Sequence, residues 1–314
     1  MYKVTIVESS GRVGGRLKNT YAVKADPNIL KYNVRKSEKG KSANDLLQRA
    51  LQRVKDDVKA HGCKVALQKY DQYSLEDYLN GEDVSPEAIR MIGDLLNQES
   101  LMNLALTEVI YLQSDVNNTI KYYEVTNGSD LLTTAFQNVL KDHVPSSSTL
   151  RTPLTHLHAD LVLVTTTAKA ALFMDFDPPL SSKKMEVLRG IHYGSSTKII
   201  LTFKEKFWLE DGIKGGKSIT DGPSRFIYYP SHSFPNNKIG KWSTDPHSLG
   251  AFALFTPYQH LILQGAVQKE GRVHFAGEHT AFPHAWIETA MKSAIRAATN
   301  INKEAARTQQ HDEL

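Results

Sequence analysis

One stretch near the C-terminus combines residue types that could hold an anionic cofactor. Residues 273–276 form a short apolar run, which predicts a buried strand, and Gly277 and Glu278 follow it directly. After a polar and aromatic loop, apolar residues recur at three- and four-residue steps and predict a helix with one apolar stripe: Ile287, Met291, Ala294, Ile295 and Ala298. The free N–H groups and the dipole of a helix N-terminus favour an anion. An ordinary strand–helix unit with a solvated Glu278 remains an equal alternative.

A second stretch with similar chemistry lies near the N-terminus. Residues 3–7 form a β-branched run closed by Glu8, and in dinucleotide-binding folds an acid at this place accepts hydrogen bonds from a ribose hydroxyl. Gly15 lies in a glycine-rich segment that allows close approach of the backbone to a phosphate, and Arg12 or Arg16 could neutralise it. A glycine-rich turn without a ligand is the plain alternative.

The motif that normally precedes such an acid does not occur in the sequence. A dinucleotide-binding unit has a first strand and a Gly-x-Gly-x-x-Gly turn about 20 residues before the acid. Only residues 1–7 precede Glu8, and the motif is found nowhere in the chain. We therefore expect the first strand–helix unit to be missing and the N-terminus to be incomplete.

Composition narrows the class of protein. A length of 314 residues suits about two domains, and 40% apolar and 23% charged residues are ordinary for a globular protein. The net charge of +4 comes without a lysine- or arginine-rich block, so we expect no nucleic-acid partner. Cys63 is the single cysteine, which excludes an internal disulfide, and we expect it to be a small buried apolar residue. No apolar run of about 18 residues occurs, so no membrane span is expected.

The C-terminus points to the secretory pathway. Residues 311–314 read His-Asp-Glu-Leu, which matches an endoplasmic-reticulum retrieval signal and makes its receptor a candidate partner. Sequons at Asn117 and Asn127 agree with a glycoprotein. No signal peptide is visible at Met1. We expect the protein in the endoplasmic-reticulum lumen or secreted, with an entry signal missing from this sequence.

Two motifs together carry a specific resemblance. Residues 8–16, Glu-Ser-Ser-Gly-Arg-Val-Gly-Gly-Arg, and residues 275–287, which contain Phe-Ala-Gly-Glu-His-Thr-Ala and His-Ala-Trp-Ile, resemble the flavin amine oxidase family. The likeness extends over nearly the whole chain and is greatest to the secreted L-amino-acid oxidases of snake venoms, fish and the interleukin-4-induced type. It implies FAD as cofactor, an L-amino acid (apolar or aromatic) and oxygen as substrates, and 2-oxo acid, ammonia and hydrogen peroxide as products. A homodimer is a further candidate assembly.

The resemblance also implies an architecture. It is an α/β fold with a discontinuous, Rossmann-like FAD-binding domain formed by residues 1–18, 121–190 and 265–302, with its first strand–helix unit missing. Residues 22–118 would be a helical insertion, because their apolar residues have helical spacing and Ser-Pro and Ser-x-x-Asp starts. Residues 191–255 would form a β-rich substrate lobe, and residues 303–314 a C-terminal tail.

Site roles follow from the matching motifs. Glu8 would bind the adenosine ribose, Arg16 the pyrophosphate, and Glu278 the pyrophosphate and ribityl region. The residues expected to line the isoalloxazine are Trp286, Ile287 and Thr289. Lys198 matches a lysine that holds a water near flavin N5, and Trp242 an aromatic wall of the pocket. As alternatives, the two tryptophans would be core residues, Lys198 a solvated strand end and Arg16 a surface ion pair. No metal site is expected.

Departures from the family pattern leave the activity open. The arginine that clamps the substrate carboxylate has no matching motif after Arg16, and a tyrosine-bearing segment is expected to be missing near residues 239–241. Loss of the first strand would unpair buried backbone in the sheet. We therefore expect weak FAD binding and low oxidase activity. The alternatives are an inactive remnant that serves as a binding protein, and a flavin oxidase acting on polyamines.

Overall fold

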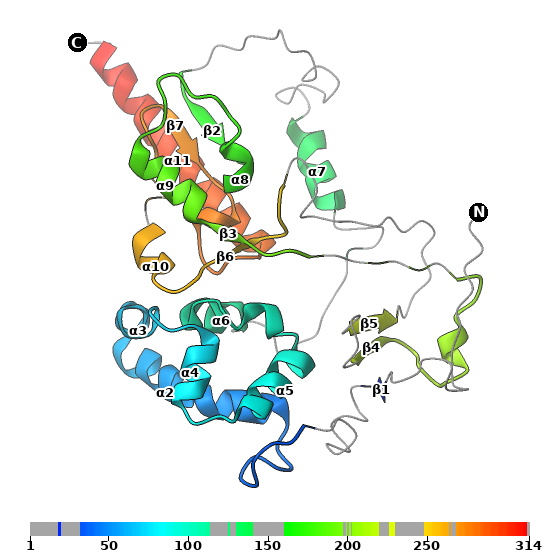
Figure 1. Ribbon diagram of the computed structural model, residues 1–314. Helices are drawn as coiled ribbons and strands as arrows, with labels where there is room; N and C mark the ends of the chain where they lie inside the picture. The colour runs from blue at the N-terminus through cyan, green and yellow to red at the C-terminus, as the bar shows by residue number, and fades with distance from the viewer. Residues whose placement is uncertain are drawn as a thin grey trace.

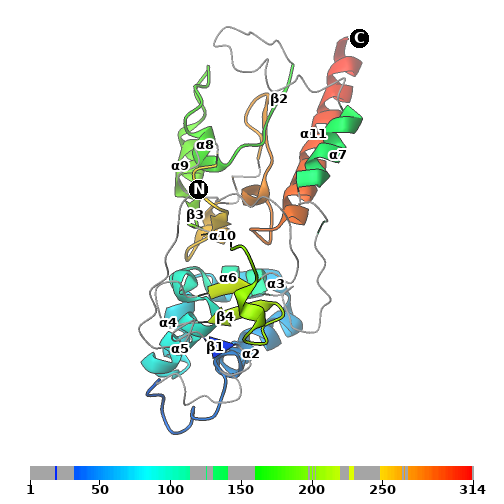
Figure 2. The same cartoon turned by 90° about the vertical axis from the view of Figure 1, so that its right-hand side faces the viewer.

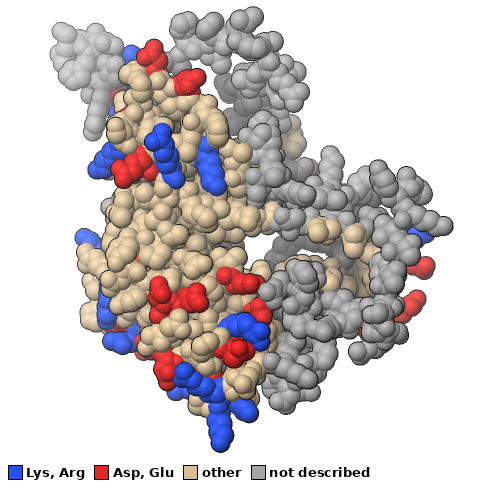
Figure 3. Space-filling view, in the orientation of Figure 1, with Lys and Arg blue, Asp and Glu red and all other residues tan. Residues whose placement is uncertain are grey.

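A computed structural model describes residues 18–19, 32–113, 125, 130–140, 160–196, 199, 201, 203–219, 226–229, 248–263, 265 and 268–312. A helical part lies below an α/β part in both views (Figures 1 and 2). Lysine, arginine, aspartate and glutamate side chains are interspersed over the visible face of the helical part (Figure 3). Within the described ranges, none of the helices has the length and apolar character needed to cross a bilayer.

Helices occur within the predicted helical insertion, between residues 43 and 113. It consists of α2 (Ala43–His61), α3 (Cys63–Tyr70), α4 (Leu75–Gly81), α5 (Pro86–Leu96), the 3₁₀ turn η1 (Glu99–Leu101) and α6 (Leu106–Gln113). Ser42 and Asp45 form a capping box at α2, and Ser85 caps α5 ahead of Pro86. The predicted apolar face of α2 is buried and forms the core with α5: Leu46, Leu47, Ala50, Leu51 and Val54.

The α/β part is organised around two parallel strands. Strand β2 (Val162–Val164) pairs with β7 (Val273–Phe275), and Val164 lies opposite Phe275. The helices of this part are α8 (Ala168–Ala171), α9 (Ser182–Gly190), α10 (Gln259–Ile262) and α11 (Ile287–Asp312), with the 3₁₀ turn η5 (Glu278–Thr280) between β7 and α11. Helix α7 (Asp130–Leu140) lies apart from α11 in Figure 1. Helix α11 runs through the predicted C-terminal tail as far as Asp312.

Short antiparallel strands occur around the predicted β-rich lobe. Strand β3 (His192–Tyr193) pairs with β6 (Ala253–Leu254). Strands β1 (Lys18–Asn19), β4 (Gly216–Ile219) and β5 (Phe226–Tyr229) form a sheet in the order β1-β4-β5, and η2 (Phe207–Leu209) contributes the buried Trp208. Backbone hydrogen bonds from Ala105 to Phe255 (2.9 Å) and from Tyr258 to Asp71 (2.8 Å) join the helical part to the chain next to β6 and α10.

One burial prediction is wrong, and the exposed face of α11 is unexpected for an apolar stripe. Cys63 is exposed as the first residue of α3, because α2 and α3 meet through other side chains. The apolar stripe of α11 faces outward, and Ile287 and Ile295 are 64% and 66% exposed. The inward face of α11 carries small and hydroxyl side chains, which allow the helix to approach the β7–η5 turn closely: Thr289, Ser293 and Ala297.

Candidate flavin site

The candidate site lies where the two parallel strands end. Thr166 and Thr167 follow β2, while Gly277 and Glu278 follow β7. Because the strands are parallel and in register, these residues lie at the same edge of the sheet. Thr167 caps α8 and donates a hydrogen bond to the Ser248 carbonyl oxygen at 2.8 Å. Ligands of open α/β sheets bind at the carboxyl ends of the strands.

Glu278 is held between two parts of the backbone. Its Oε1 accepts a hydrogen bond from Ala253 N at 2.9 Å, and its Oε2 accepts one from Ala285 N at 3.0 Å. The carboxylate therefore ties strand β6 to the corner that precedes α11. Each oxygen of an ionised carboxylate has two acceptor positions, so each can still accept a further donor from a ligand.

The backbone around this corner is tightly constrained. Gly277 has φ of 141°, and a Cβ on it would lie 2.7 Å from the His279 ring, so glycine is required there. Ala285 has φ of 68°, in the left-handed region. Burial, followed by the electrostatic effects of His284, Lys184 and Arg296, lowers the pKa of His279 to about 4. His279 is therefore a neutral packing residue at physiological pH.

Four of the predicted site residues lie together at this edge. Glu278 and Trp286 are partly buried, Ile287 is exposed at the start of α11, and Thr289 is buried on its inner face. The first turn of α11 is thus accessible to a ligand next to the two strand ends. The other predicted site residues lie outside the part of the chain that the structure describes: Glu8, Arg12, Gly15, Arg16, Lys198 and Trp242.

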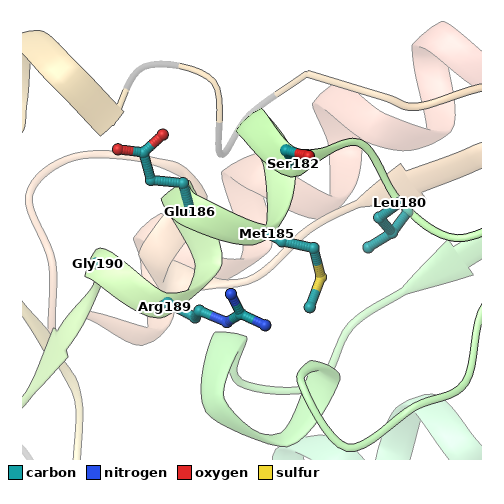
Figure 4. Close-up of a pocket in the computed structure, with 6 residues that line it drawn as sticks. All are labelled: Leu180, Ser182, Met185, Glu186, Arg189 and Gly190. Atoms are coloured by element: carbon teal, nitrogen blue, oxygen red, sulfur yellow. The ribbon is translucent and has the colours of Figure 1, made fainter.

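A separate hollow of about 540 Å³ runs along α9 (Figure 4). In the close-up, Met185 and Arg189 extend to the same side of α9, and Glu186 extends away from them. No predicted site residue lines it, and the charged groups do not converge on one point. We therefore place the candidate site at the strand ends. Among the described residues, no group of His, Cys, Asp and Glu is arranged to hold a metal ion.

A buried ionisable cluster next to the corner was missed from the sequence. Asp71, Glu108, His260 and His284 come together from α3, α6, α10 and the loop before α11, and each is at most 3% exposed. One sequence signal was available, because Glu108 interrupts the otherwise apolar face of the helix at residues 106–112. A buried carboxylate requires partners.

Comparison with known proteins identifies the family. The sequence matches the family described as flavin containing amine oxidoreductase over residues 143–241 and 238–302. It is 54% identical to the L-amino-acid oxidase of Siganus canaliculatus, covering 93% of this chain and 69% of that protein. The chain belongs to the flavin amine oxidase family. Other similar family members are the L-amino-acid oxidases of Pseudechis australis, 36% identical over 91% of this chain and 68% of theirs, and Naja atra, 35% identical over 91% and 69%.

These flavin amine oxidase relatives are longer within the aligned region. The alignment with the Siganus protein extends over 362 residues, which exceeds the 314 residues of this chain, so that protein contains internal segments without counterpart here. The family match is also interrupted at residues 238–241. This break coincides with the place where a tyrosine-bearing segment is expected to be missing.

Proposed function

We propose that this protein catalyses the FAD-dependent oxidative deamination of L-amino acids, with oxygen and water as co-substrates and 2-oxo acid, ammonia and hydrogen peroxide as products. The observation that carries the proposal is the 54% identity to an L-amino-acid oxidase over 93% of the chain. The family match, which includes the Glu278 to α11 region, supports flavin as the cofactor.

The described residues fit one side of a flavin site. The edge where β2 and β7 end is followed by an accessible helix N-terminus, and Glu278 keeps free acceptor positions for hydroxyl donors. The chemistry that FAD supplies when bound is acceptance of a hydride from the substrate Cα and reduction of oxygen to hydrogen peroxide. The remaining catalytic work, which is orientation and exclusion of water, belongs to side chains of this protein.

Within this proposal, the C-terminal motif forms the wall beneath the isoalloxazine. Trp286 and Ile287 would cover its face, and Thr289 would fix the first turn of α11 against the sheet. Glu278 would accept hydrogen bonds from the ribityl hydroxyls while it holds Ala285. These groups would restrict the cofactor to one orientation, which is the main contribution a protein makes to flavin chemistry.

The N-terminal motif and two further residues complete the proposed site. Glu8 would bind the adenosine ribose, and Arg12, Gly15 and Arg16 would accommodate the pyrophosphate. Lys198 would hold a water near flavin N5, and Trp242 would form the opposite wall of the substrate pocket. We further propose a Rossmann-like arrangement of the FAD-binding segments and a location in the secretory pathway.

A flavin spectrum of the purified full chain tests the proposal. Visible flavin absorbance should be present after incubation with FAD, and it should bleach when L-Phe or L-Leu is added without oxygen. D-Phe serves as the stereochemical control, and spermine tests for a polyamine oxidase. A protein that stays colourless after incubation with FAD, or one that bleaches only with spermine, would contradict the proposal.

The internal shortening favours a second candidate function. This chain lacks segments that the Siganus protein contains. The second candidate is therefore a binding protein without oxidase activity. This candidate predicts a folded chain that binds L-Phe in calorimetry but produces no hydrogen peroxide in the presence of FAD.

A further inference from the structure

The cluster of Asp71, Glu108, His260 and His284 connects the two parts of the molecule. Asp71 caps the C-terminus of α3 and Glu108 lies on α6, both in the helical part. His260 lies on α10 and His284 in the loop before α11, both in the α/β part. Figure 1 shows α10 facing α3 and α6 across this boundary.

Each member of the cluster contacts the next. His260 Nδ1 lies 2.6 Å from Asp71 Oδ1, which also accepts a 2.6 Å hydrogen bond from the Thr107 hydroxyl. His260 Nε2 lies 3.0 Å from Glu108 Oε2. His284 Nδ1 lies 2.9 Å and 3.1 Å from the two Glu108 oxygens. The contacts thus run from α3 to the corner before α11.

The contacts influence the protonation of His260, Glu108 and His284. Both nitrogens of His260 lie next to carboxylate oxygens, which only accept when ionised, so this environment favours a hydrogen on each nitrogen. Burial lowers the pKa of His260, but the contacts with Asp71 and Glu108 outweigh it and leave the pKa above its usual value. Burial raises the pKa of Glu108, but the hydrogen bonds to His260 and His284 outweigh it and leave that pKa lowered. The His284 bond requires a hydrogen on Nδ1.

Aromatic rings surround the two imidazoles. The centroid of Phe255 lies 4.4 Å from that of His284 and 5.1 Å from that of His260. Phe282 lies 4.7 Å and 5.1 Å from the same rings. In such an apolar environment a hydrogen bond to a charged group is strong, and an unpaired buried charge raises the free energy of the folded state. The position of His284 is therefore well determined.

His284 precedes the corner that presents the candidate site. Ala285, the next residue, adopts its left-handed conformation and donates its N–H to Glu278, and Trp286 and the first turn of α11 follow. We propose that Asp71, Glu108, His260 and His284 are positioning residues: they fix the corner at residues 284–286 and so orient Trp286 and the start of α11 for the flavin. The inference rests on the proposed function. Because these side chains are almost fully buried, they act through the corner and do not touch the substrate.

Substitutions at His284 test the inference. Asparagine places an amide nitrogen where the Nδ1 lies, so H284N should keep the Glu108 bond, whereas H284A and H284Q should lose it. We expect kcat to fall roughly 10- to 100-fold in H284A and H284Q with little change in KM, because misplaced groups slow the chemical step. H284N should stay within about threefold of the unmodified protein.

His274 provides the matched control. It is a buried histidine of β7, 3.3 Å from Glu304, and Glu304 lies 17 residues along α11 from its start, about 25 Å away. H274A should lower stability and leave kcat and the flavin spectrum unchanged. Equal effects of H284A and H274A on kcat, or no recovery in H284N, would overturn the inference.

Hydrogen exchange gives a readout that does not depend on flavin. Amides of residues 281–290 should exchange faster in H284A than in the unmodified protein and in H284N. E108Q, which keeps an acceptor oxygen, should give an intermediate rate. Unchanged exchange in H284A would refute the positioning role. If the unmodified protein neither binds FAD nor oxidises L-Phe, the proposed function fails, and the exchange experiment still decides whether the cluster holds the corner.

Discussion

Replacing Glu278 with glutamine should lower the free energy of unfolding by about 1.5–3 kcal/mol, which is the contribution of one hydrogen bond to a charged group. The carboxylate accepts one backbone N–H on each oxygen, from Ala253 at 2.9 Å and Ala285 at 3.0 Å. Glutamine keeps one acceptor oxygen and replaces the other by an NH₂ group. One of the two amides would then face another donor, and β6 and the corner before α11 would lose one connection.

The matched control is E288Q on the next element. Glu288 lies in the first turn of α11 and pairs with Lys292 at 2.7 Å, but both side chains are largely exposed, at 75% and 68%. A surface pair of this kind contributes less than about 1 kcal/mol, so E288Q should have little effect. The same chemical change is thus compared at a carboxylate that binds two backbone amides and at a surface ion pair.

Urea unfolding followed by circular dichroism measures both variants. The E278Q midpoint should move to lower urea at an unchanged slope, and hydrogen exchange should show faster opening of Ala285. The reasoning is refuted if E278Q loses no more stability than E288Q. It is also refuted if the loss appears while Ala285 exchanges as before, because the hydrogen bond to the corner would then not be the cause.

Further predictions follow from single sites. Burial lowers the pKa of Lys184 to about 8, so between about pH 8 and pH 10 the unfolded chain binds more protons than the folded one. Urea unfolding should show stability rising with pH across this window in the unmodified protein but less in K184M. A285G should raise the free energy of unfolding by up to about 1 kcal/mol in calorimetry, because alanine is strained at φ of 68°. I92A should lower it by about 2–5 kcal/mol in urea unfolding, whereas V65A at an exposed position should change it little. Cys63 should react with a thiol reagent in the folded protein without prior unfolding, because it is exposed.

The helical part could be predicted from the sequence because its signals are local. The spacing of Leu47, Leu51 and Val54 and the Ser-Pro start of α5 each lie within a few residues. The run at residues 273–276 also predicted a strand correctly, and the acid after it lies at the strand's end.

The sequence could not predict in the same way which face of α11 packs inward or which residues form the ionisable cluster. Periodicity identifies an apolar face of α11 but not its neighbour, and the structure turns Ser293 and Ala297 toward β7 and η5. The cluster joins residues as far apart as Asp71 and His284. A pairing between distant residues leaves no periodic pattern in a single sequence.

The boundary between the two parts of the molecule has a consequence for unfolding. Tyr258 donates its N–H to Asp71 O, Ala105 donates its N–H to Phe255 O, and His260 lies between two buried carboxylates at the same boundary. Separating the parts would leave these charges without partners before either core has opened. The two parts should therefore melt in one cooperative transition, with a calorimetric enthalpy equal to the van't Hoff enthalpy, and loss of the Glu108 carboxylate should separate the melting of the helices from that of the sheet.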